Sequence, residues 1–96
     1  MEERIGNVHA GEVLKEEFLD PMGISPYRLA KDIEVQQTRI SQIISGKRGL
    51  SVDTALRLGK YFGMSAKFWM NLQISYDLEE EKKKLEEVLN RIPHAS

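Results

Sequence analysis

Residues Pro26–Lys47 read PYRLAKDIEVQQTRISQIISGK, and their apolar and polar residues are spaced as in two short helices joined by a tight turn. Ala30 is small where the second helix must pass close to the first. Larger apolar residues occupy the contact positions around it: Leu29, Ile33, Val35, Ile40 and Ile43. This layout predicts a helix-turn-helix, a unit that places its second helix in the major groove of DNA.

The second helix of this pair, expected over 37–45 and ending at Gly46, turns short hydrogen-bonding side chains away from the core. Ile40, Ile43 and Ile44 lie within about 100° of one another around the helix axis and face inward. The opposite, uncharged face presents Thr38, Ser41, Gln42 and Ser45. Lys and Glu normally dominate a solvated helix surface, so this face favours contact with base edges.

Amide and hydroxyl side chains can read DNA bases, because glutamine pairs bidentately with adenine and a hydroxyl can bond several base edges. Arg39 and Ser41 could alternatively contact phosphates. A polar helix that merely keeps the domain soluble is the competing interpretation. The candidates for base reading are Gln37, Thr38 and Gln42, followed by Gln36, Arg39 and Ser41.

The formal net charge is −1, but the charges are unevenly spread along the chain. Residues 1–24 hold two basic and six acidic residues, whereas residues 25–61 hold seven basic and three acidic ones. The basic excess coincides with the predicted DNA-reading unit, where phosphate contacts would need it, although a chance fluctuation among solvated charges is the alternative. The candidates for phosphate contact are Arg28, Lys31, Lys47 and Arg48.

Capping residues set the ends of the other expected helices. The first runs over about 11–19 and stops before Pro21, because proline disrupts a helix interior. Ser51 and Ser65 can cap two later helices, the earlier of which ends at Gly63. No pair of strands with an Asn-Gly or Asp-Gly turn is visible. We therefore expect an all-α fold, a compact bundle of five to six short helices.

A chain of 96 residues can bury one modest core and is too short for two. We expect a single domain over 1–96, with a DNA-binding core at about 11–63, a helix over 65–77 and a C-terminal helix over 78–92. No stretch approaches the ~20 apolar residues that cross a bilayer, and nothing at the N-terminus looks like a signal peptide. A cytoplasmic protein without a membrane segment is expected.

Catalysis finds no support in the residue pattern. The chain has no cysteine, which excludes a disulfide framework, a thiolate zinc site and a cysteine nucleophile. His9 and His94 lie near opposite ends of the chain without a fixed partner, and no HExxH, GxSxG or phosphate-binding glycine loop occurs. We expect neither an enzyme nor a bound cofactor or metal.

The helix that begins at Ser65 has two apolar faces. Phe68, Trp69, Leu72 and Tyr76 can face the domain's own core. The second face is predicted to form a homodimer interface, because a symmetric dimer that binds two DNA half-sites needs its recognition helices about one DNA turn (~34 Å) apart. Intramolecular packing in a monomer is the alternative. The predicted interface residues are Met70, Ile74 and Leu78.

The continuation of this helix is ambiguous in sequence. If it runs on without a break, further apolar residues extend the second face: Leu85, Val88, Leu89 and Ile92. Glu81 would interrupt that face, and a break near Asp77 fits the sequence equally well.

Longer segments allow a comparison with known families. HAGEVLKEEFLDPMGIS, RLAK, RISQIISGKRGLSVDTALRLGKYFG and FWMNLQISYDLE follow one another over about residues 8–80. Together they resemble the HigA (VapI) antitoxin family, whose helix-turn-helix is of the lambda repressor/Cro (XRE-like) type. The resemblance implies a lambda-repressor-like fold and a homodimeric antitoxin. It also implies binding to a double-stranded DNA operator, repression of the protein's own operon, and neutralisation of a HigB-like ribonuclease toxin.

One position departs from the general helix-turn-helix class. The turn residue that is usually glycine is Glu34 here. A left-handed conformation costs a non-glycine residue on the order of 1 kcal/mol, unless a changed turn avoids that conformation.

Two other functions remain open: a helix-turn-helix regulator without a toxin, and a protein-interaction module that no longer binds DNA.

Overall fold

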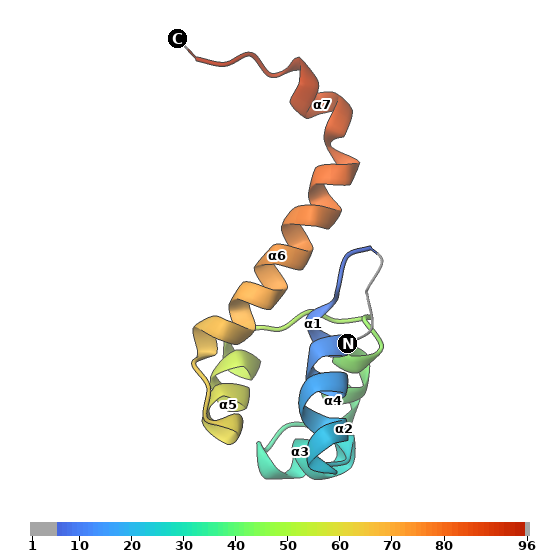
Figure 1. The fold of residues 1–96 in the computed structure, drawn as a ribbon, viewed down its shortest axis with the longest axis vertical. Coiled ribbons are helices and arrows are strands. Elements are labelled where there is room, and N and C mark those ends of the chain that lie inside the picture. Colours follow the sequence, from blue (N-terminus) through green and yellow to red (C-terminus); the bar gives the residue numbers. More distant parts are fainter. Residues whose placement is uncertain (1–5, 96) are drawn as a thin grey trace.

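The computed structural model describes residues 6–95, and within them the chain is helical with no strand. Figure 1 shows a helical bundle from which one long helix projects, and the molecule measures 51 × 29 × 23 Å. The all-α prediction is confirmed for this part of the chain. The elements are α1 (Ala10–Val13), the π-helix η1 (Leu14–Leu19), α2 (Asp20–Met22), α3 (Pro26–Asp32), α4 (Gln37–Ile44), α5 (Val52–Phe62), α6 (Ala66–Lys84) and α7 (Glu86–Arg91).

α1, η1 and α2 form one continuous helix with a wider π segment in its middle, where the N–H of Asp20 donates to the carbonyl of Lys15 five residues earlier. The prediction that this helix stops before Pro21 is wrong. Pro21 instead lies inside the continuous helix, two residues after the π segment ends at Leu19. The helix ends instead at Gly23, which takes a left-handed conformation with φ of 66°.

α3 and α4 form the predicted helix-turn-helix. The hydroxyl of Ser25 accepts from the N–H of Arg28 at 3.1 Å and caps α3. In the turn, the N–H of Val35 donates to the carbonyl of Ala30 at 3.0 Å. Glu34 has φ of 61°, so the turn keeps the left-handed conformation although the residue is not glycine.

The core lies where the helix-turn-helix meets α1, α5 and the first half of α6. Ile40 and Ile43 are fully buried, as their spacing predicted. Trp69 is also fully buried, and its ring centroid lies 4.9 Å from that of Phe18, which leans in from η1. Burial of such side chains stabilises the fold by roughly 1.5–3 kcal/mol each. The core therefore fixes the orientation of α4 relative to the rest of the bundle.

α6 is a single helix over Ala66–Lys84, and its second half projects away from the bundle (Figure 1). The predicted division into helices at 65–77 and 78–92 is wrong, because the break falls at Leu85. No glycine or proline occurs between Ala66 and Leu85. The carboxylate of Asp77, where a break was considered, accepts a hydrogen bond from Gln73 one turn earlier at 2.9 Å. The helix therefore continues through Asp77.

Candidate nucleic-acid interface

The outer face of α4 carries the amide and hydroxyl side chains singled out in the sequence. Gln37, Thr38 and Ser41 are exposed, and Gln42 is half-buried. Gln36 is exposed at the N-cap of α4, where its side chain makes no capping bond. The buried isoleucines hold the helix by its opposite face. The base-reading candidates on α4, apart from Arg39, are thus on one accessible surface.

Arg39 is placed differently from these residues. Its Nη1 donates to Oδ1 of Asp53 at 3.1 Å and to Oγ1 of Thr54 at 3.4 Å. Its side chain is 32% exposed and leans against the start of α5. Since Asp53 is 14 residues away in the chain, periodicity within α4 could not reveal this contact.

The loop between α4 and α5 carries Lys47 and Arg48, both exposed. Their backbone N–H groups donate to the same carbonyl, that of Gln42, at 2.8 and 3.2 Å. Gly46 makes this return possible, because it takes a left-handed conformation with φ of 80°. The two basic side chains therefore start from a backbone that is tied to the end of α4.

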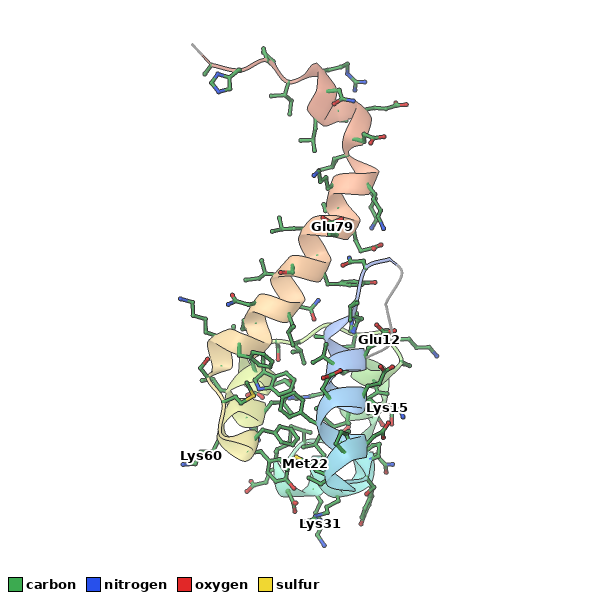
Figure 2. The ribbon with its side chains drawn as sticks, in the orientation of Figure 1. Glu12, Lys15, Met22, Lys31, Lys60 and Glu79 are labelled. Atoms are coloured by element: carbon green, nitrogen blue, oxygen red, sulfur yellow. The ribbon has the colours of Figure 1, made fainter. Side chains whose placement is uncertain are left out.

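Arg28 and Lys31 are exposed on α3. Arg28 lies 3.5 Å from the carboxylate of Asp32, which leaves most of its side chain in solvent. Figure 2 shows Lys31 at the end of the bundle that is farthest from the projecting half of α6. The four candidates for phosphate contact thus bracket α4 along the chain, two on the helix before it and two in the loop after it.

Sequence reasoning missed Arg57, which supports the helix-turn-helix from α5. Its Nη1 donates to the carbonyls of Ile33 and Glu34 at 2.7 and 3.3 Å, and its Nε donates to Asp53 at 2.8 Å. The hydrogen bond from Arg57 is the main cause that lowers the pKa of Asp53, and the contact from Arg39 adds to it. The spacing of Asp53 and Arg57 at i,i+4 was a usable signal. Their link to the turn was not visible in sequence.

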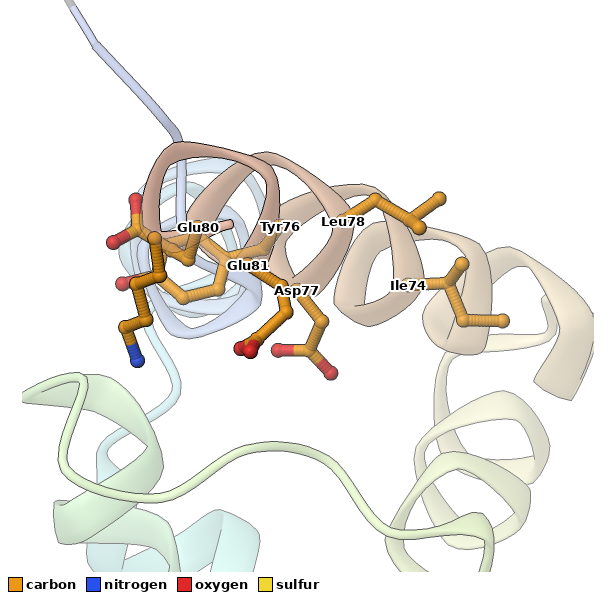
Figure 3. Close-up of a pocket in the computed structure, with 7 residues that line it drawn as sticks. Ile74, Tyr76, Asp77, Leu78, Glu80 and Glu81 are labelled. Carbon is orange, nitrogen blue, oxygen red and sulfur yellow. The ribbon is translucent and has the colours of Figure 1, made fainter. Parts of the chain in front are cut away.

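The three predicted interface residues have different surroundings. Met70 is half-buried and packs against the core, whereas Ile74 and Leu78 are 49% and 66% exposed. Figure 3 shows Ile74, Asp77 and Leu78 on α6 among the residues that line a groove of about 650 Å³. The exposed apolar residues continue beyond α6 as Leu85, Val88, Leu89 and Ile92.

Other kinds of site are not formed by the residues that the structure describes. Within 6–95, no three or more His, Cys, Asp or Glu side chains gather in a way that could hold a metal ion. No helix in the same range has the length and apolar character needed to cross a membrane.

The family model described as helix-turn-helix matches residues 14–69. Virulence-associated protein I of Dichelobacter nodosus is 47% identical over 81 residues, which cover 81% of this chain and 75% of that protein. Antitoxin HigA-1 of Vibrio cholerae is 36% identical over 80 residues, which cover 83% and 75%. The chain belongs to the HigA-type helix-turn-helix family.

Its fold is that of solved HigA antitoxins. The structure of Pseudomonas aeruginosa antitoxin HigA with the higBA promoter superposes with a TM-score of 0.91 at 38% identity, covering 95% of this chain and 100% of that one. The resemblance to HigA antitoxins that the sequence segments indicated is thereby confirmed. Relatives of this HigA-type chain also include proteins named as HTH-type transcriptional regulators, so the family is one of regulators and antitoxins.

Proposed function

We propose that this protein is a sequence-specific DNA-binding repressor and the antitoxin of a toxin–antitoxin module. It binds its own operator as a homodimer, represses its operon, and neutralises a partner ribonuclease toxin. It acts in the cytoplasm, where the operon lies, and it has no catalytic role. The observation that carries the proposal is the exposed amide and hydroxyl face of α4, bracketed by basic residues, in a chain similar to a HigA solved with promoter DNA.

The chemistry of α4 supports reading from the major groove. Gln37 and Thr38 stand in its first turn, the end of a recognition helix that meets base edges in this class of motif. A glutamine amide can pair with adenine, and a threonine methyl can contact the thymine methyl. Lys47 and Arg48 would neutralise phosphates beside the groove, which supplies affinity without sequence preference.

Footprinting of the DNA upstream of the protein's own gene tests the proposal directly. The purified protein should protect an inverted repeat whose half-sites are about one DNA turn apart (~34 Å). Addition of the toxin encoded beside the gene should produce a complex with the protein. Absence of a protected site would contradict the repressor function. A protected site without any toxin complex would contradict the antitoxin function and support a regulator without a toxin.

Substitution of the base-reading candidates tests their assignment. Gln37→Ala and Gln42→Ala should each weaken operator discrimination by ~1–3 kcal/mol while salt-dependent binding to unrelated DNA is kept. Asn71→Ala is a matched control, because Asn71 is an exposed amide on α6, away from α4. If neither glutamine variant changes the sequence preference, Gln37 and Gln42 do not read bases.

The proposed homodimer uses the exposed face of α6. Ile74 and Leu78 are large apolar side chains in solvent, and burial of such a face between two copies is favourable. In sedimentation at micromolar concentration, the protein should run as a dimer, and Leu78→Glu should shift it toward the 11.0 kDa monomer. Glu79→Gln, on the neighbouring position, should leave the dimer intact. A wild-type protein that sediments as a monomer would contradict the interface.

A regulator without a toxin is the second candidate. A relative from Haemophilus influenzae, 33% identical over 86 residues, is named an uncharacterized HTH-type transcriptional regulator. Co-expression separates the two functions. An antitoxin should restore growth to cells that express the neighbouring reading frame, whereas a regulator alone should change only transcription.

A further inference from the structure

Gln73 is a polar side chain buried in the first half of α6, where it is 6% exposed. Its Oε1 accepts from the backbone N–H of Leu50 at 2.7 Å. Its Nε2 donates to Oδ1 of Asp77 at 2.9 Å. Leu50 belongs to the loop between α4 and α5, so one side chain of α6 supplies an acceptor to a loop 23 residues earlier in the chain.

The loop also packs directly on the Gln73 amide. Gly49 lies so close that a Cβ at this position would stand 2.7 Å from Nε2 and 2.9 Å from Cδ of Gln73. Real Cβ atoms do not approach other atoms this closely, because such contacts are strongly repulsive. A hydrogen bond at Leu50 therefore holds the loop on Gln73. The absence of a side chain at Gly49 allows the close approach.

This docking fixes the far end of the segment that carries Lys47 and Arg48. Its near end is fixed by the two N–H groups that donate to the carbonyl of Gln42. Lys47 and Arg48 supply these N–H groups themselves and directly precede the anchor at Gly49 and Leu50, and their side chains are exposed. Long cationic side chains on a fixed backbone lose less freedom when they meet phosphates than the same side chains on a loose loop.

We propose that Gln73 is a positioning residue for operator binding. From α6, it holds the loop so that Lys47 and Arg48 meet the phosphates beside α4. The inference rests on the proposed function. Ile74, the next residue along α6, is exposed on the proposed dimer face. The same turn of α6 therefore connects the dimer helix to the DNA-contacting loop.

The test measures operator affinity of the full-length protein by fluorescence anisotropy over a range of salt concentrations. Gln73→Met removes both hydrogen bonds of the amide at similar length. It should weaken operator binding on the order of tenfold and reduce the slope of log K against log salt by up to about 1.8, about 0.9 for each lost phosphate contact. Discrimination between operator and unrelated DNA through α4 should change little.

A variant cycle separates positioning from loss of stability. In a Lys47→Ala/Arg48→Ala background, Gln73→Met should cause no further loss of operator affinity, because the side chains it positions are gone. An equal loss in both backgrounds would overturn the inference. An unchanged salt slope for Gln73→Met in the otherwise wild-type chain would overturn it as well.

Two further measurements keep the inference testable if Gln73→Met does not fold. Gly49→Ala forces the loop and the Gln73 amide apart and should reproduce the reduced salt slope. In the wild-type protein, the Leu50 amide should exchange with solvent as slowly as core amides, because its N–H is bonded to a buried acceptor. Fast exchange at Leu50 would overturn the inference without any variant.

The outcomes distinguish this inference from the proposed function. If the wild-type protein does not prefer its operator, the proposed function fails. If it does, and Lys47→Ala/Arg48→Ala leaves the salt slope unchanged, the assignment of the loop to phosphates fails. If the wild-type protein prefers its operator and Lys47→Ala/Arg48→Ala reduces the salt slope, but Gln73→Met binds like wild type, only the role of Gln73 is wrong.

Discussion

Arg39 on α4 donates to Asp53 on α5, with 3.1 Å between Nη1 and Oδ1. The same carboxylate oxygen accepts from Nε of Arg57 at 2.8 Å, and Arg57 in turn holds the carbonyls of the turn before α4. Asp53 therefore joins the recognition helix, the turn and α5 in one network. The arrangement also directs the charge of Arg39 toward the protein's own carboxylate.

Asp53→Ala should release Arg39 for contact with DNA phosphates. We expect binding to an unrelated duplex to strengthen, with the slope of log K against log salt steeper by about 0.9 for one added contact. Glu79→Ala is the control, because it removes the same charge from the projecting half of α6 (Figure 2). Equal slopes for the two variants would show that Arg39 is not held back by Asp53.

Gly11→Ala should destabilise the protein strongly. A Cβ at Gly11 would overlap the backbone carbonyl oxygen of Ile43, so α1 and the end of α4 could not keep their close approach. Overpacking of this kind costs roughly 1–3 kcal/mol, measured here by urea unfolding. Glu12→Ala, at the neighbouring exposed position, should stay within about 0.5 kcal/mol of wild type. A stable Gly11→Ala variant would mean that the two helices are farther apart than described.

Glu34→Gly should stabilise the protein, because residue 34 has φ of 61° and glycine adopts this conformation without steric cost. The gain should be at most about 1 kcal/mol in thermal or urea unfolding, reduced by the greater freedom of glycine in the unfolded chain. Glu34→Ala keeps the steric cost and should show no such gain. The explanation fails if the glycine variant is less stable than the alanine variant.

Tyr61 should make stability depend on pH in the alkaline range. Its hydroxyl donates to Asp32 at 2.6 Å, and this hydrogen bond raises the pKa of Tyr61 above its ordinary value. The bonded, protonated phenol therefore contributes stability below the ordinary tyrosine pKa of about 10. That contribution is lost as pH rises through the higher pKa of the folded state.

Urea unfolding at several alkaline pH values can isolate this contribution. The stability difference between wild type and Tyr61→Phe should shrink as the pH rises. Tyr27→Phe, which removes a phenol that is 61% exposed, is the matched control and should show no such trend. A difference that stays constant with pH would rule out the proposed bond to Asp32.

The site was partly predictable because much of it depends on one helix. Three caps or ends followed from local chemistry: Ser51, Ser65 and Gly63. The outward row on α4 followed from helical periodicity once Ile40 and Ile43 were assigned to the core. Whether those outward residues read bases remains a prediction.

The helix ends that were wrong show where local rules fail. Pro21 was expected to end the first helix, but the helix continues through the π segment and past this proline to its end at Gly23. The break near Asp77, one of the two alternatives, does not occur: the helix continues to Leu85, and the Gln73 amide pairs with Asp77 across one helical turn. In both places, the helix continues past the expected break.

The sequence by itself determined the all-helical fold, the helix-turn-helix and the polar face of α4, since helix periodicity and capping act between residues less than about five positions apart. Only the tertiary structure decided that Arg39 turns to Asp53, that Arg57 supports the turn, and that Gln73 holds the loop at Leu50. These partners lie 14 to 24 residues apart. Contacts over such separations depend on how whole helices pack, and no local spacing encodes them.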